Sequence, residues 1–172
     1  MAEVENVKID SSDAEAVMLE LNNAGEHIII SPDDTAMFDR FATGIRRIIE
    51  MVDEMSKKLS EIEKQYKGKE DYQSRADEAI AISRENVNFS REAVKIIDGI
   101  FGEDTIKKYF RDIYNKIPDF QPSSDCITDF LERITPTIEK IFNRKVNAQG
   151  QLSKQRMAKY QPQDHKKPSA KK

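Results

Sequence analysis

The side chains that could perform covalent chemistry are few in this sequence. Cys126 is its only cysteine, and His27 and His165 are its only histidines. A helix dipole can activate a thiol in the first turn of a helix, so Cys126 with either histidine is a candidate nucleophilic pair. His27, however, falls in a β-prone run and His165 in a polar tail, and no glycine-built oxyanion loop accompanies them. We therefore interpret Cys126 as a small, buried structural residue.

Two pairs of adjacent acids are the candidates for metal binding or acid–base work. They are Asp33-Asp34 and Glu103-Asp104. Both pairs fall where helices are expected to begin, and carboxylates complement the positive end of a helix. The sequence has no calcium-loop spacing and no Cys/His cluster for zinc. We therefore expect no metal, no cofactor and no enzymatic activity.

A G-x-x-G string at residues 99–102 lies inside the most apolar segment of the chain. Some RNA-binding modules use such a string to let the backbone approach phosphates. Here Ile100 and Phe101 lie between the glycines and two acids follow, which would repel phosphate. No dinucleotide-type glycine loop and no phosphate-loop lysine motif occurs. We interpret Gly102 as a left-handed helix terminus, followed by the cap of a short helix.

Composition favours one helical domain with a charged tail. The 172 residues are 38% hydrophobic and 34% charged, with a net charge of −3. From residue 147 onward there are seven basic residues and one acid, so the rest of the chain is acidic. The tail has one aromatic residue, Tyr160, and no amphipathic pattern, so we expect a partner-contacting arm and no nucleic-acid or membrane binding. The single cysteine, the acidic start and the lack of a long apolar run predict a cytoplasmic protein.

Three regions are expected along the chain. The first is an acidic N-terminal segment, 1–31, with a short strand possible at 7–9. Within it, two β-prone runs at 17–21 and 26–30 flank an Asn/Gly turn and favour a β-hairpin. A weak helix at 13–22 remains the alternative. A helical domain, 32–146, and a disordered basic tail, 147–172, follow.

Two long helices are predicted to form an antiparallel hairpin. Ser31-Pro32-Asp33-Asp34 is a strong helix start, so we place the first helix at 33–67 and the second at 71–101, joined through Gly68. The apolar residues of the first helix form a heptad seam over four repeats: Phe38, Phe41, Ile45, Ile48, Val52, Met55, Leu59, Ile62 and Tyr66. The second helix carries a lean seam at Ala76, Ile80, Ser83 and Val87 that becomes aliphatic toward its end, and a second apolar row beside it.

Two further helices are expected, at 104–115 and at 124–146. The first has one apolar face, and the second is expected to kink at Pro136. The whole is a mainly α fold with a small N-terminal β element.

The candidate partner-binding surface is the end of the hairpin near Gly68. There the flanks of the first helix are charged and the second helix has small side chains, so the two helices bury little of each other. The candidate residues are Met55, Leu59, Ile62, Tyr66, Ala76 and Ile80. We expect this end to engage another helix, from a protein partner or from a second copy of the chain.

The C-terminal two-thirds of the chain carries an ordered set of short motifs. A long helix runs into Phe-Gly-Glu-Asp-Thr at 101–105, an aromatic short helix holds Tyr109-Phe110, Cys126 begins the last helix, and the basic end includes Tyr160. In this order the segment resembles a small family encoded in the tail-gene modules of phages and prophages of Gram-positive bacteria. Those proteins are similar to tail assembly chaperones, which keep the helical tape measure protein soluble while the tail tube polymerises around it.

The resemblance implies a non-enzymatic chaperone in the bacterial host cytoplasm, with a tape measure or other tail protein as its partner. Long helices with an exposed apolar seam and no active site are compatible with that function. The alternative is a structural coiled-coil adaptor that stays in a multiprotein assembly.

Overall fold

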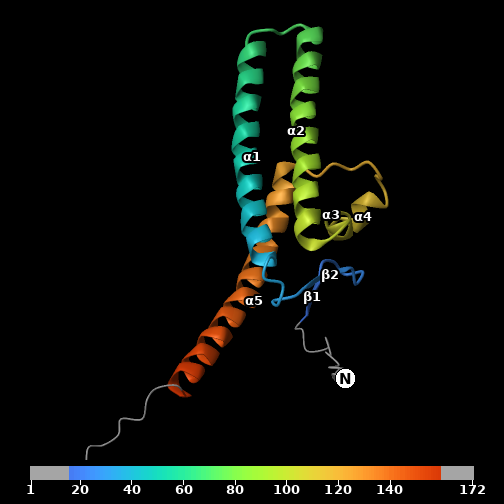
Figure 1. The fold of residues 1–172 in the computed structure, drawn as a ribbon. Helices are drawn as coiled ribbons and strands as arrows, with labels where there is room; N and C mark the ends of the chain where they lie inside the picture. The colour runs from blue at the N-terminus through green and yellow to red at the C-terminus, as the bar shows by residue number, and fades with distance from the viewer. Residues whose placement is uncertain (1–15, 160–172) are drawn as a thin grey trace, which may run out of the picture.

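A computed structural model describes residues 16–159 and is mainly helical, as predicted. Figure 1 shows two long antiparallel helices with a third long helix beside their lower half. The elements are β1 (Val17–Glu20), β2 (His27–Ile30), α1 (Met37–Tyr66), α2 (Tyr72–Phe101), α3 (Thr105–Tyr109), α4 (Arg111–Tyr114) and α5 (Ser124–Lys159). The strand considered at 7–9 and residues 160–172 of the tail lie outside the described residues. No helix within 16–159 combines the length and the apolarity that crossing a bilayer would need.

The β-hairpin is formed, and it excludes the alternative helix over 16–22. β1 and β2 pair antiparallel, with Val17 opposite Ile30 and Leu19 opposite Ile28. Side chains alternate between the two faces, as a half-buried strand requires. Ile28 and Ile30 are buried, whereas Met18 and Ile29 point outward and remain exposed.

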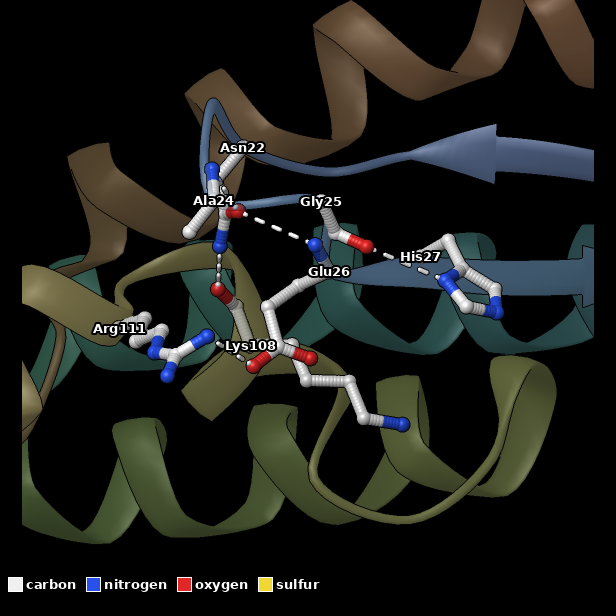
Figure 2. Close-up of polar contacts among 7 residues, drawn as sticks. All are labelled: Asn22, Ala24, Gly25, Glu26, His27, Lys108 and Arg111. Carbon is white, nitrogen blue, oxygen red and sulfur yellow. Dashed lines mark hydrogen bonds and ion pairs between the residues drawn. The ribbon is translucent and has the colours of Figure 1, made fainter.

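Polar contacts fix the hairpin to the short helices (Figure 2). The side chain of Asn22 accepts the backbone N–H of Ala24 at 2.9 Å, which closes the turn. Its amide donates to the carbonyl oxygen of Lys108 at 2.5 Å, and Arg111 pairs with Glu26 at 2.7 Å. The last two contacts join segments 85 or more residues apart in the chain, so they position the β element against α3 and α4.

The first long helix begins at Met37 rather than at residue 33. Asp34 forms a turn of its own before the helix. Its carboxylate accepts the backbone N–H of Ala36 at 3.0 Å, and its carbonyl oxygen accepts that of Met37 at 3.1 Å. Arg40 donates to the same carboxylate at 2.6 Å. The predicted cap is therefore wrong, because Asp34 stabilises a turn before the helix and α1 itself begins without a side-chain cap.

The contact between α1 and α2 uses mainly the second apolar row of α2, although Phe101 of the seam also contacts Phe41 of α1. Gly44 allows a close approach, because a Cβ at this position would lie 2.5 Å from Cδ1 of Ile100 and 3.0 Å from Cγ2 of Ile96. Farther along, Lys58 pairs with Glu85 at 3.0 Å across the same interface. The turn at the far end is made by Gly68, with φ of 80°. The residues of this row that lie against α1 include Phe89, Ile96 and Ile100.

The G-x-x-G segment ends α2 at Gly102, as predicted, whereas α3 begins at Thr105 without the side-chain cap that was expected. Gly102 has φ of 108°, and its N–H donates to the carbonyl oxygen of Asp98 at 2.9 Å. The hydroxyl of Thr105 donates to the carbonyl oxygen of Gly102 at 2.7 Å. The helix expected at 104–115 is two short helices, because Phe110 leaves helical geometry with φ of −98° and ψ of 28°.

The last helix begins at Ser124 as expected but continues to Lys159, which corrects the predicted end at 146. The helix continues through Pro136 without a break. The sequence over 147–159 is polar, which suggested disorder, yet it is rich in Gln, Ala, Lys and Arg. These residues have high helix propensity, so polarity alone was a poor guide here.

The core lies where α1, α2, α3 and α5 meet. Ring centroids of Phe41 and Phe101 are 6.0 Å apart, those of Phe101 and Phe130 are 6.2 Å apart, and those of Tyr109 and Phe130 are 5.0 Å apart. These edge-on aromatic contacts connect four helices. The end of the hairpin away from Gly68, where α2 carries its large aliphatic residues, is therefore the end held in the core, as its sequence indicated.

Candidate functional site

In the lower half of the hairpin, α5 packs beside both long helices. On α1, Ile45, Ile48 and Val52 border a groove whose other wall is α5, with Leu131 and Pro136 among its lining residues. At the base of the same contact the rings of Phe38 and Phe142 lie 5.1 Å apart. Because low-numbered residues of α1 meet high-numbered residues of α5, the two helices run antiparallel, and the start of α5 lies near Val52.

The predicted binding residues of α1 continue the surface that faces α5. Seven residues make two turns of a coiled-coil helix, so positions fourteen apart share a face. Fourteen residues beyond Ile45, Ile48 and Val52 lie Leu59, Ile62 and Tyr66. All three are half-buried.

The predicted residues of α2 continue the surface that faces α5 in the same way. Phe101 contacts Phe130 of α5, and Ile97 is fully buried nearby. Three heptads earlier on α2 these positions are occupied by Ile80 and Ala76. Ile80 is 49% exposed, whereas its equivalent Phe101 is 8% exposed.

We call the continuation of this surface beyond α5 the distal face: Leu59, Ile62, Tyr66, Ala76 and Ile80. Figure 1 shows α1 and α2 extending well beyond the start of α5, with no other helix of residues 16–159 alongside. A third helix therefore covers the lower part of the hairpin surface, and the upper part lies beyond its reach. The grouping of these five residues as a binding surface stays a prediction, and the sequence analysis placed the lean row of α2 against α1 rather than beside it.

Met55 takes the same heptad position as Ile48 and Ile62, but its side chain is buried. It is 8% exposed and lines a depression with Phe89, Lys58 and Glu85 between α1 and α2. We therefore leave Met55 out of the distal face, because a buried side chain offers little surface to a partner.

A second apolar surface is the groove between α1 and α5. It has a volume of about 450 Å³ and is lined by Ile45, Ile48, Ile49, Val52, Thr128, Leu131, Glu132, Thr135 and Pro136. Ile49 stands at its edge and is 58% exposed. Ile49 therefore keeps its side chain at the surface beside α5.

The residues weighed for chemistry are not assembled into a reactive site within the described part of the chain. Cys126 is half-buried in the first turn of α5, and its backbone N–H donates to the hydroxyl of Ser123 at 3.3 Å. His27 is exposed on β2, with its ring near the carbonyl oxygen of Gly25. His165 lies outside the described residues. Between residues 16 and 159, no three His, Cys, Asp or Glu side chains are grouped so that they could hold a metal.

The buried carboxyl of Asp98 has a structural position at the junction of α2 and α3. Burial raises the pKa of this carboxyl, and the nearby backbone N–H groups of Ile106, Thr105 and Asp104 offset part of the effect. One of its oxygens has no hydrogen-bond partner among the described residues. The carboxyl lies at the start of a five-residue helix, which explains its position without a ligand.

Comparisons with protein-family models, with curated proteins and with solved structures find no match for this chain.

Proposed function

We propose that this chain binds an apolar helix of another protein on its distal face, as a tail assembly chaperone does for a tape measure protein. The observation that carries the proposal is the uncovered continuation of a surface that elsewhere holds a helix. α5 already demonstrates the mode of packing on the lower part of the hairpin. A partner helix in line with α5 would meet positions of the same heptad phase.

The side chains of the distal face indicate what such a helix must carry. Along this row of α2 the small residues Ala76 and Ser83 alternate with the larger Ile80 and Val87. Small residues leave room for large ones, so the partner should present bulky apolar residues at heptad spacing. Such a helix would expose a long apolar stripe when unbound, which is the property of a protein that needs a chaperone.

The test is to co-express this chain with the tape measure protein of the same tail module and to measure the soluble fraction of the latter. Ile80→Glu places a charge on the distal face where the side chain is already half exposed, so the fold should survive. Burial of an isoleucine contributes about 1.5–3 kcal/mol, so its loss should weaken binding at least about tenfold. We expect the tape measure protein to become largely insoluble.

Two matched variants locate the effect. Ile117→Glu lies in the loop before α5, where Ile117 is 54% exposed, and should leave solubility unchanged. Ile49→Glu changes the groove between α1 and α5 instead. If Ile49→Glu abolishes solubility and Ile80→Glu does not, the distal face is not the binding surface. The double change Leu59→Glu with Ile62→Lys should have the same effect on binding as Ile80→Glu. Both residues are half-buried, so this change should also destabilise the hairpin.

A further inference from the structure

Charged side chains border the distal face on its α2 side. Asp77 and Arg84 are one heptad apart on α2, and two heptads farther along the same row holds Asp98. Asp98 lies against the start of α3, and Figure 1 shows α3 on the side of α2 that faces away from α1. Ile80 of the distal face is three residues from Asp77 and four from Arg84, so both charges are its neighbours on the helix surface. The row of Asp77 and Arg84 therefore runs along the outer edge of the distal face.

Glu63 borders the distal face on its α1 side. Ile49 stands at the edge of the groove between α1 and α5, and Glu63 lies fourteen residues beyond it on the same face of α1. A helix on the distal face would thus lie between Glu63 on one side and the row of Asp77 and Arg84 on the other.

The two charges on α2 lie at different heights along the hairpin. The ion pair of Lys58 with Glu85, at 3.0 Å, shows which residues of α1 and α2 are level. Arg84, next to Glu85, is therefore at the lower end of the distal face, nearest to α5. Asp77 is level with Tyr66, near the tip of the hairpin. Seven residues of helix span about 10 Å, which is about the screening length at physiological salt, so a bound helix meets the two charges separately.

These bordering charges are not neutralised by other side chains between residues 16 and 159. Glu63 and Arg84 are exposed and form no ion pair within that range. Asp77 is half-buried, and its carboxylate accepts a hydrogen bond from the neutral amide of Gln73 at 3.0 Å. The turn at 67–71 carries two lysines and two acids, so it adds no net charge. The border of the distal face is thus negative near the tip and positive near α5.

The start of α5 gives this surface a direction. A helix on the distal face meets the first turn of α5 at its lower end. The free N–H groups of a helix start carry positive partial charge, and the free carbonyl groups of a helix end carry negative partial charge. Asp125 in the first turn of α5 offsets part of the positive charge, whereas Arg84 adds to it. The lower end of the distal face therefore favours the C-terminal end of a bound helix.

We propose, resting on the proposed function, that the bound helix runs from the tip of the hairpin toward α5 and carries a defined charge pattern. Its N-terminal half presents basic side chains to Glu63 and Asp77, and its C-terminal half presents acidic side chains to Arg84. The apolar stripe supplies the affinity, and the flanking charges set direction and partner choice, as they do in coiled coils. An isolated helix is stabilised by the opposite distribution, so the site discriminates against helices of that kind.

Two synthetic peptides of three heptads test the charge pattern. They share one composition and one apolar stripe. The basic-first peptide has lysine beside the stripe in its first heptad and glutamate there in its last, and the acid-first peptide has the reverse. Fluorescence anisotropy measures their binding to the full chain. At about 50 mM salt we expect the basic-first peptide to bind at least about threefold more tightly, because it alone satisfies both charge and direction. About 500 mM salt should remove the difference while apolar binding persists.

A charge-exchanged protein separates the bordering charges from properties of the peptides. The variant Asp77→Lys with Arg84→Glu should prefer the acid-first peptide. The two peptides differ in their own helix stability, but that difference is the same for both proteins and cancels from the comparison. The matched control is Arg46→Glu with Asp53→Lys, which exchanges two exposed charges one heptad apart on α1, below the distal face. It should keep the preference for the basic-first peptide.

A nitroxide on the N-terminus of the basic-first peptide measures the direction. It should broaden backbone amide signals around Gly68 and leave those of residues 124–127 unaffected. Broadening at 124–127 alone would overturn the proposed direction. Equal affinity for the two peptides, or an unchanged preference in the charge-exchanged protein, would overturn the charge pattern and leave the proposed function standing. If neither peptide binds, this inference and the proposed function both fail.

Discussion

Asp98 shows what one buried carboxyl contributes to the junction of α2 and α3. Its raised pKa means that the folded state binds the proton of this carboxyl more tightly than the unfolded state does. The stability that this tighter binding provides is complete below the ordinary aspartate range and is lost as the pH rises through the raised pKa. The backbone N–H groups at the start of α3 lie near this carboxyl, so Asp98 helps to position α3.

The first prediction concerns the pH dependence of stability. The free energy of unfolding of Asp98→Asn should be compared with that of the unchanged protein from pH 3 to pH 7 by denaturant titration. As the pH rises above the ordinary aspartate range, the free energy of unfolding of the variant should increase relative to that of the unchanged protein, because asparagine does not titrate. A difference that is constant with pH would show that Asp98 titrates normally.

The second prediction is that Cys126 is structural. Cys126→Ser should change the free energy of unfolding by no more than about 1 kcal/mol, because the residue is half-buried and its backbone hydrogen bond to Ser123 is kept. Solubilisation of the tape measure protein should remain at the level of the unchanged chain. Lost binding in a variant that unfolds normally would assign the thiol a function.

At the scale of elements, the α1–α2 hairpin is fixed by one close approach and one sharp turn. Gly44 admits Ile96 and Ile100 of α2, and Gly68 supplies the turn. The sequence predicted both helices, their antiparallel pairing and the turn, because heptad spacing and glycine placement are local signals. It did not predict which row of α2 faces α1, since both rows are apolar and only packing distinguishes them.

The third prediction uses two glycines that are both inside helices. Alanine in place of either should stabilise its helix by up to about 1 kcal/mol. At Gly99 there is no atom within 4 Å of the added Cβ, so the full gain should appear. At Gly44 the Cβ would lie 2.5 Å from Ile100, so that side chain must move and the gain should be reduced or reversed. Thermal unfolding of both variants checks this, and a Gly44→Ala as stable as Gly99→Ala would contradict the close approach.

Short and polar elements were less predictable than the hairpin. α1 begins at Met37 and not at the predicted residue 33, because Asp34 forms a turn before the helix. An Asp side chain can stabilise either a turn or a helix start, so its presence did not distinguish the two. The end of α5 moved to Lys159 because polar residues with high helix propensity suit both a helix and a loose tail. In both cases the residue types allowed two local structures, and tertiary context decided between them.

At the scale of the whole molecule, the chain is an incomplete three-helix arrangement. One end of the hairpin is buried among α3, α5 and the β-hairpin, and at the other end no third helix of the described residues covers the distal face. Five of the six candidate residues taken from the sequence, all except Met55, give this surface its apolar character. Ile80 is well exposed among them. The central claim is that a helix of a tape measure protein completes the arrangement there.

The most direct measurement of that claim is site-specific photo-crosslinking during co-expression with the tape measure protein. A photoreactive amino acid replaces Ile80 on the distal face, Ile49 in the groove between α1 and α5, or Ile117 in the loop before α5. The account predicts a crosslink to the tape measure protein from position 80 and none from position 117. A crosslink from position 80 to a second copy of the chain alone, or to the tape measure protein only from position 49, would contradict it.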